Sequence, residues 1–444
     1  MATAVSGTGE SFHPDWQARP YWWDAVPPKP ADDPLPAQVD VAIVGSGYCG
    51  LNAARELARN GLSVAVLDAR DPGFGASTRN HGMLSGGLKI PAGLDARLGT
   101  EWAEAVRRTA FDSFGFIKDL IRDEKLDVDY AETGRFIGAH SPAWYEKLKA
   151  RRDELQQRYG YDVRMVPRAE QHAEVGSDFF HGGIVIRESG GMHPAKLHRA
   201  VWDLAEAAGA RVYGNAEVMR IEGAPGRFTL STTRGQVAAQ KVLVATNAYT
   251  GAFNGTMSPY LAHRLIPVTA YMVATEELPP DLARKIMPTN RMGADTKRSL
   301  FAYRLSPDGR RVVFAGRAKF RDIDERAATP ILHRFICTVW PELRDVRITH
   351  TWKGFVGFTF DKMPHLGEHN GIHYVAGCQG NGVALMSYLG HQAALKMLSG
   401  SARQCGHDGV PFPTRPLYRG HPWFLPAVGA YYKSRDAIDR LFVS

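Results

Sequence analysis

The sequence predicts an α/β protein in which a nucleotide-binding unit is combined with strands of a different kind. A strand, a glycine turn, a helix, a second strand and an acidic residue follow one another between Val39 and Asp68. Strands and helices alternate again from residue 183, whereas 267–274 and 299–304 have the pattern of antiparallel strands. With 444 residues, the chain is long enough for two or three domains.

The first unit carries the complete dinucleotide fingerprint. The apolar strand Val39–Val44 leads into Gly45-Ser46-Gly47-Tyr48-Cys49-Gly50, a helix follows, and Asp68 ends the strand 63–67. Gly45 permits the tight turn, Gly47 lets the backbone approach a pyrophosphate, and Gly50 lets helix and strand pack closely. The helix N-terminus then faces the phosphates. Asp68 is placed to accept a hydrogen bond from a ribose hydroxyl. Its carboxylate would repel a 2′-phosphate, so NADP is disfavoured.

Composition excludes several other classes of protein. The formal charge of +8 is spread over scattered arginines and lysines, which indicates a solvated surface rather than a nucleic-acid footprint. The four cysteines form no CxxC pair, so neither a disulfide framework nor a metal site is expected. The start lacks the pattern of a signal peptide, and no apolar run could span a membrane. A soluble, cytoplasmic protein is expected.

Residues 1–37 are rich in proline and aromatic residues, which predicts an extended arm docked on the body of this chain or a neighbour. The glycine-rich loop 73–87 suits a backbone lying against a flat ligand. The following segments are expected to be helix 102–121, strands 127–130 and 135–139, a helix from Ser141-Pro142 to Tyr159, strand 184–187 and helix 195–208.

The second half repeats this mixture of elements. Strands are expected at 211–221, 228–232 and 241–245, then at 267–274, 299–304, 311–315, 348–352 and 372–376, with a helix before Trp340. Gly377 to Gly382 form a second glycine turn, which opens an apolar helix over 383–398. A tail is expected after residue 412.

Five motifs carry a family resemblance. GSGYCG, GFGASTRN, GGMHPAKL, VLVATNAY and AGCQGNGVAL occur in this order. Together they resemble the D-amino-acid oxidase superfamily of FAD enzymes, the glycine and sarcosine oxidase type, and nearly the whole chain is similar to the branch acting on gamma-glutamyl polyamines. The resemblance implies a discontinuous Rossmann-type FAD domain at 38–98, 183–250 and 352–412. A substrate domain with a mixed, largely antiparallel sheet would occupy 99–182 and 251–351.

The resemblance also implies the cofactor contacts, with the adenosine end of FAD at the first glycine turn and the flavin ring between the domains. Val218 would touch adenine through its backbone, and the helix start near Gly382 would stabilise negative charge on reduced flavin. The expected contacts are Gly45, Gly47, Tyr48, Cys49, Gly50, Asp68, Ala69, Arg70, Gly75, Ala76, Ser77, Thr78, Arg79, Asn80, His81, Gly82, Met83, Leu84, Val218, Thr246, Asn247, Gly380, Asn381, Gly382, Val383 and Ala384.

FAD is expected to be bound without a covalent link. No cysteine lies in 353–360, where some sarcosine oxidases attach the flavin, and Arg79 stands where dimethylglycine-type relatives have a histidine. His81 and Cys378 are therefore expected to be ordinary non-covalent residues.

The activity implied is oxidation of an amine C–N bond by hydride transfer to flavin N5, with O2 as the acceptor and H2O2 as product. Lys353 and Lys319 are candidate cations for oxygen reduction, and Arg304 is the candidate for binding a substrate carboxylate. A flavin dehydrogenase that passes electrons to a carrier or quinone, and a non-catalytic nucleotide-binding protein, remain alternatives. An NAD-dependent dehydrogenase would leave the later motifs unexplained.

Overall fold

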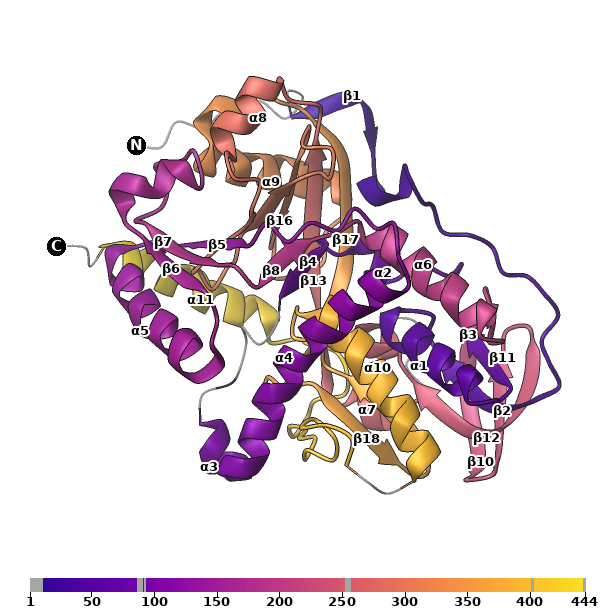
Figure 1. Cartoon of the computed structure of the whole chain (residues 1–444). Helices are drawn as coiled ribbons and strands as arrows, with labels where there is room; N and C mark the ends of the chain where they lie inside the picture. The colour runs from indigo at the N-terminus through magenta and orange to yellow at the C-terminus, as the bar shows by residue number, and fades with distance from the viewer. Residues whose placement is uncertain (1–10, 86–90, 92, 252–256, 401–402, 442–444) are drawn as a thin grey trace.

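The computed structural model describes residues 11–85, 91, 93–251, 257–400 and 403–441, which form two large sheets (Figure 1). The eight-stranded sheet has the order β10-β11-β12-β2-β3-β9, and β19 joins it beside β12 and pairs with β18. Its strands are β2 (Gln38–Val44), β3 (Val64–Leu67), β9 (Arg211–Tyr213), β10 (Val218–Ala224), β11 (Arg227–Thr232), β12 (Gly235–Val244), β18 (His365–His369) and β19 (Ile372–Ala376).

The centre of this sheet is parallel, as the fingerprint requires. β12 pairs in parallel with β2 and β19, and β3 pairs in parallel with β2 and β9. Helices α1 (Tyr48–Arg59), α4 (Thr100–Asp123), α6 (Pro194–Ala207) and α10 (Gly382–Ser399) pack together beside it (Figure 1). Because parallel strands at the centre of a sheet are buried on both faces, β3 is apolar and buried at every position, and β2 is buried from Val41 to Val44.

The second sheet has nine strands in the order β1-β17-β13-β16-β15-β14-β5-β7-β6. All neighbours are antiparallel except the pairs β1–β17 and β14–β5. The strands are β1 (Phe12–Gln17), β5 (Arg135–Gly138), β6 (Val163–Val166), β7 (Gly183–Ile186), β13 (Leu265–Thr275), β14 (Met292–Asp295), β15 (Ala302–Leu305), β16 (Val312–Gly316) and β17 (Ile348–Thr359). The predicted fold class, with its mixed and largely antiparallel second sheet, is confirmed.

Shorter elements connect the two sheets. β4 (Met83–Ser85) pairs with β8 (Ser189–Gly191), and helix α9 (Glu325–Val339) packs on β13 and β17. The remaining elements are η1 (Tyr21–Trp23), α2 (Ala76–Arg79), α3 (Leu94–Leu98), α5 (Pro142–Tyr159), η2 (Arg168–Ala173), η3 (Asn247–Gly251), α7 (Pro259–Ala262), α8 (Pro280–Ile286), η4 (Pro341–Leu343) and α11 (Leu425–Leu441). In the described part of the chain, we find no helix with the length and apolar character to cross a membrane.

Several predicted elements are confirmed together with their physical cause. Helix α5 begins where Ser141 accepts a hydrogen bond from the Trp144 N–H, and it ends at Gly160, whose φ is 69°. Strand β19 has the predicted bounds. Sequence patterns were informative here because caps and short apolar runs act locally.

Other predictions were wrong. Residues 127–130 form no strand, because Asp129 adopts a left-handed backbone with φ of 51°. The single strand expected over 211–221 is split into β9 and β10, and Asn215 between them has φ of 52°. The C-terminal tail after residue 412 stays a prediction; it includes helix α11.

The expected domain boundaries at 183 and 352 do not match the division between the sheets. Strand β7 pairs with β5 and β6 in the nine-stranded sheet, although 183–250 was assigned to the FAD domain. Strand β17 continues through residue 352 without a break. The rest of the division into cofactor and substrate domains remains a prediction.

The N-terminal arm docks on its own chain. It begins with β1 on the edge of the nine-stranded sheet and runs along the outside of the molecule to β2 (Figure 1). Trp22 in this arm is fully buried. The arm is therefore an integral part of the fold.

Candidate active site

A cavity of about 430 Å³ is lined by residues of both large sheets. Its wall on the eight-stranded side contains the two glycine turns, the end of β3 and the loop 73–81. The nine-stranded side contributes residues of β5, β13, β15, β16 and β17. The cavity thus connects the predicted cofactor site with the sheet predicted to bind the substrate.

The first glycine turn has the geometry that a dinucleotide needs. Gly45 has φ of 102°, a conformation that side chains disfavour, and its N–H donates to the Leu67 carbonyl at 2.8 Å. A Cβ at Gly50 would collide with the Gly45 carbonyl oxygen, whereas a Cβ at Gly47 would lie 3.0 Å from Ser77 Oγ. Gly50 therefore serves helix–strand packing, and Gly47 keeps the wall of the cavity open.

Asp68 lies beside this turn and faces the cavity. Its Oδ2 accepts from the Ser46 N–H at 2.8 Å and from the Ser46 hydroxyl at 2.6 Å, and Oδ1 accepts from the Arg70 N–H at 3.1 Å. Burial raises the pKa of Asp68, and the hydrogen bonds from Ser46 oppose this shift. The carboxylate is thus held in one orientation, with acceptor capacity left for a ribose hydroxyl.

The loop after β3 places Arg79 in the cavity wall. Its Nε donates to the Phe74 carbonyl at 2.6 Å and a terminal nitrogen donates to the Lys353 carbonyl at 3.0 Å. Burial lowers the pKa of Arg79, and none of the ion pairs among the described residues includes it. A buried guanidinium without a carboxylate is suited to an anionic ligand.

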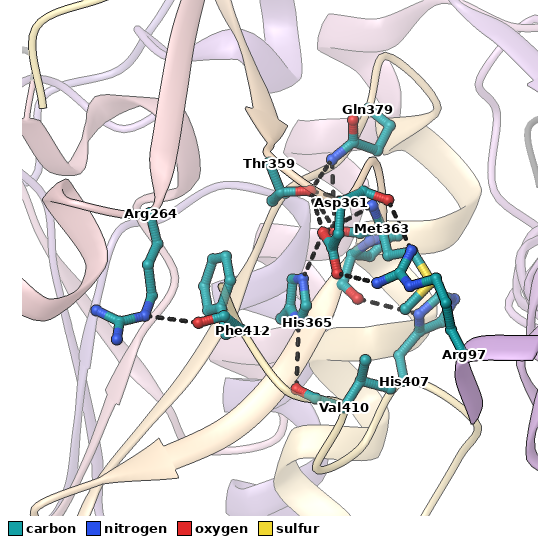
Figure 2. A network of polar contacts seen from close by, with 12 residues as sticks. Arg97, Arg264, Thr359, Asp361, Met363, His365, Gln379, His407, Val410 and Phe412 are labelled. Atoms are coloured by element: carbon teal, nitrogen blue, oxygen red, sulfur yellow. Dashed lines mark hydrogen bonds and ion pairs between the residues drawn. The ribbon is translucent and has the colours of Figure 1, made fainter. Parts of the chain in front are cut away.

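The second glycine turn is held from below by a buried polar network (Figure 2). Gln379 Nε2 donates to Thr359 Oγ1 at 2.8 Å, and Thr359 Oγ1 donates to Asp361 Oδ1 at 2.8 Å. Asp361 also contacts His365 Nε2 at 3.1 Å and the Arg97 guanidinium at 3.1 Å. The network joins the turn, through Gln379, to the end of β17 and to the residues that follow it.

Above this network, helix α10 begins at Gly382, and its N-terminus faces the cavity. Gly380, Asn381, Gly382 and Val383 all line the cavity. Gln379 has φ of 52° and Gly380 has φ of 76°, so the turn is tight. The positive end of a long helix is therefore directed to a place where negative charge can be stabilised.

The structure brings together most of the residues predicted to contact the cofactor. Those lining the cavity are Gly45, Gly47, Tyr48, Cys49, Asp68, Ala69, Arg70, Gly75, Ala76, Ser77, Arg79, Asn80, His81, Met83, Val218, Thr246, Asn247, Gly380, Asn381, Gly382 and Val383. The predicted contacts Gly50, Thr78, Gly82, Leu84 and Ala384 lie behind this surface. Leu84 and Ala384 belong to the core, and Thr78 is almost completely buried.

The residues predicted for catalysis and substrate binding lie elsewhere. Lys353 Nζ binds Asp322 at 2.8 Å and the Ile323 carbonyl at 3.0 Å, and its side chain points away from the cavity that Gly354 lines. Lys319 is exposed and outside the cavity lining. Both lysines therefore lie outside the cavity lining, and their role as oxygen-side cations stays a prediction.

Arg304 also lies outside the cavity lining. It is fully buried, and its guanidinium donates to the carbonyls of Leu305 at 2.9 Å and Met192 at 2.8 Å. Through Nη1 the side chain also contacts the Gly82 carbonyl, so it supports the backbone just before β4 and just after β8. Nε and Nη1 are thus bound to main-chain oxygens, and the contact with a substrate carboxylate stays a prediction.

Three arginines that the sequence analysis missed line the cavity instead. Arg298 pairs with Asp436 at 3.1 Å and Asp439 at 2.7 Å of helix α11. Arg135 and Arg317 have no acidic partner among the residues that the structure describes. Burial lowers the pKa of Arg135 to about 10 and also lowers that of Arg317, yet both stay cationic at neutral pH.

His81 is a buried neutral residue of the cavity wall. Burial, together with the nearby Arg304 and Arg135, lowers the pKa of His81 to about 3. Its Nε2 lies 3.0 Å from the Val313 carbonyl, so this nitrogen carries the proton. Cys378 lies in the same wall and contacts the Gly357 carbonyl through its sulfur at 3.8 Å.

The residues present fit FAD. The glycine turn leaves room for a backbone approach, and the acid, the isolated Arg79 and the α10 N-terminus match the hydroxyl and anionic groups of a dinucleotide. The expectation of FAD thus agrees with the shape and the charge of the cavity.

Comparisons with known proteins agree with this interpretation. Residues 40–395 match the family model described as FAD dependent oxidoreductase, DAO. The chain is 32% identical over 412 residues to gamma-glutamylputrescine oxidoreductase of Escherichia coli (strain K12), covering 90% of this chain and 93% of that protein. It is 31% identical over 375 residues to a probable oxidoreductase OrdL of Rhizobium meliloti (strain 1021), covering 83% and 86%.

Solved structures show the same fold. Glycine oxidase from Geobacillus kaustophilus has a TM-score of 0.69 and 21% identity, covering 86% of this chain and 99% of its own. L-proline dehydrogenase from P. horikoshii has a TM-score of 0.67 and 18% identity, covering 89% and 99%.

Proposed function

The chain belongs to the DAO family of FAD-dependent oxidoreductases, and we propose that it oxidises an amine that carries a carboxylate, such as a gamma-glutamyl polyamine, with O2 as electron acceptor. Bound FAD would supply a hydride acceptor at N5 for the C–H bond beside the substrate nitrogen, and the imine product would hydrolyse to a carbonyl compound and an amine. The residues of the chain bind and orient the partners of this reaction.

The observation that supports a carboxylate-bearing substrate is the pair of isolated arginines. Arg135 and Arg317 reach the cavity from the nine-stranded sheet, and neither has an acidic partner in the described part of the chain. Arg298, by contrast, is neutralised by Asp436 and Asp439. A guanidinium in a sheltered wall gains most from a carboxylate, which it can bind through two hydrogen bonds.

The rest of that wall favours an extended, partly apolar molecule. Met272, Leu300, Phe355 and Phe358 line the cavity on the nine-stranded side. Such side chains exclude water and contact methylene groups, while the distal charge is bound by arginine. A polyamine with a gamma-glutamyl group has this combination, because methylenes separate a terminal amine from a carboxylate.

The relatives support the same choice. A protein named gamma-glutamylputrescine oxidoreductase matches 90% of this chain. Relatives named glycine oxidase support O2 as the acceptor. The N–H groups at the start of α10 are proposed to stabilise negative charge on the reduced flavin.

Rates of peroxide release with gamma-glutamylputrescine, putrescine, glycine and sarcosine test this proposal. Arg135→Ala and Arg317→Ala should each raise KM for gamma-glutamylputrescine by roughly ten- to hundredfold, on the order of 1.5–3 kcal/mol for a charge-assisted bond. Putrescine, which has no carboxylate, should be affected little. Arg334→Ala, at an exposed position of α9, is the matched control.

Two results would contradict the proposal. Equal losses on putrescine and on the carboxylate-bearing amines would remove both arginines from carboxylate recognition. Turnover with an artificial dye but without peroxide formation in air would replace O2 by another acceptor.

A further inference from the structure

Three tryptophans converge on three consecutive residues of the cofactor loop. Trp23 Nε1 donates to Thr78 Oγ1 at 2.9 Å, and Trp22 Nε1 donates to the Asn80 carbonyl at 2.9 Å. Between them, Trp352 Nε1 of β17 donates to the Arg79 carbonyl at 2.9 Å. Two of the three indoles belong to the N-terminal arm, which lies outside the matched family segment 40–395.

The arm also fixes the side chain that this loop directs into the cavity. The Arg79 guanidinium carbon lies 4.6 Å from the centre of the Trp23 ring and 4.4 Å from that of Phe74. Two aromatic faces and two carbonyl oxygens therefore hold the cation. Without the ring of Trp23, one side of the Arg79 guanidinium would lose its aromatic contact.

The loop needs such external support. Helix α2 has only four residues, and an isolated turn of helix is unstable because one or two hydrogen bonds do not offset its ordering. Asn80 closes the turn by donating to the Ser77 carbonyl at 2.7 Å. The indole N–H groups add hydrogen bonds to this loop from the N-terminal arm and from β17.

The arm is anchored independently of this loop. Strand β1 pairs with β17, and Trp16 Nε1 donates to Thr351 Oγ1 at 3.1 Å. Trp22 is fully buried, with ring contacts at 5.1 Å to His193 and 6.5 Å to Trp352. Trp22 and Trp23 are thus held by contacts outside the loop as well as by those with it.

We propose that Trp22 and Trp23 are positioning residues of the cofactor site, which hold Thr78, Arg79 and Asn80 in the conformation that binds FAD. Arg79 and Asn80 line the cavity, whereas the two tryptophans act only through them. The arm then contributes to tight FAD binding, although it carries no nucleotide-binding motif.

The test compares Trp22→Phe and Trp23→Phe with Trp16→Phe. Each variant keeps an aromatic ring and removes one indole N–H, and Trp16 lies in the same arm but bonds to β17. The dissociation constant of FAD is measured by flavin fluorescence on apoprotein, together with thermal unfolding of the apoprotein. Trp22→Phe and Trp23→Phe should weaken FAD binding about tenfold, whereas Trp16→Phe should leave it unchanged.

A double-mutant cycle separates positioning from general stability. Thr78→Val removes the acceptor of the Trp23 bond and also the hydroxyl that donates to the Gly73 carbonyl, so the double variant with Trp23→Phe should bind FAD no more weakly than Thr78→Val alone. If Trp22→Phe does not fold, Trp23→Phe and this cycle decide alone. Unchanged FAD affinity in Trp23→Phe, equal weakening in Trp16→Phe, or additive effects in the cycle would overturn the proposal.

Discussion

Asp68 accepts hydrogen bonds from both the backbone N–H and the hydroxyl of Ser46, at 2.8 and 2.6 Å. The acid at the end of β3 is therefore joined to the first glycine turn before any ligand is considered. This contact couples the two parts of the fingerprint, which lie 22 residues apart in the chain.

Removal of this acid should weaken FAD binding. Asp68→Ala loses both the expected ribose contact and the support of the turn, so the dissociation constant of FAD should rise at least about tenfold. Asp119→Ala, at an exposed position of α4, is the control. An unchanged FAD affinity in Asp68→Ala would exclude the predicted ribose contact.

A branched side chain at Gly47 should prevent cofactor binding. Gly47→Val places methyl groups where a Cβ already lies 3.0 Å from Ser77 Oγ, on the wall that the pyrophosphate must approach. The purified variant should lack the yellow colour. Gly115→Ala adds a Cβ that meets nothing within 4 Å and should retain FAD. Full FAD content in Gly47→Val would contradict the assignment of this turn.

FAD should be released when the protein is denatured by acid. His81 is a neutral residue whose Nε2 bonds to Val313, and no cysteine lies in 353–360. After precipitation, the flavin absorption should remain in the supernatant. Flavin in the pellet would indicate a covalent link, with His81 and Cys378 as the first residues to examine.

Acid should destabilise the protein below neutral pH. Burial lowers the pKa of His198 to about 4, and His81, His193 and His407 are shifted in the same direction. Above about pH 6.5 these histidines are neutral in both states; as the pH falls below that value, the unfolded chain takes up protons first. The free energy of unfolding should therefore fall between pH 6.5 and about 4.

A single substitution tests the lowered pKa of His198. His198→Gln can still donate to the Ser46 carbonyl but cannot titrate, so the loss of stability between pH 7 and 5 should shrink by roughly 1–2 kcal/mol. Denaturant unfolding at both pH values measures it, with the exposed His421→Gln as control. An unchanged pH dependence in His198→Gln would contradict the shifted pKa.

The parts that the sequence predicted well are those with local causes. The glycine turns need positive φ or close approach, and Ser141 and Gly160 end a helix through neighbouring hydrogen bonds. The sequence did not show which way the Arg304 side chain points. A strand residue can face either side of a sheet, and the flanking strands decide what it meets there. Arg135 of β5 was missed for the same reason, and Arg317 lies just after the end of β16, where no strand pattern places its side chain.

The docking of the N-terminal arm also depends on contacts between residues that lie far apart in the chain. Its aromatic residues predicted docking, but the hydrogen bond from Trp23 to Thr78 joins residues 55 positions apart. Only the three-dimensional pairing of β1 with β17 brings them together. Side-chain orientation and long-range pairing are therefore what the sequence alone did not provide.

An anaerobic titration of the purified protein with gamma-glutamylputrescine shows whether the chain oxidises amines through its flavin. We expect loss of the oxidised flavin absorption on adding about one equivalent of amine per FAD, and its return with peroxide formation when air is admitted. Absorption that stays unchanged with gamma-glutamylputrescine, putrescine, glycine and sarcosine would contradict the assignment as an amine oxidoreductase.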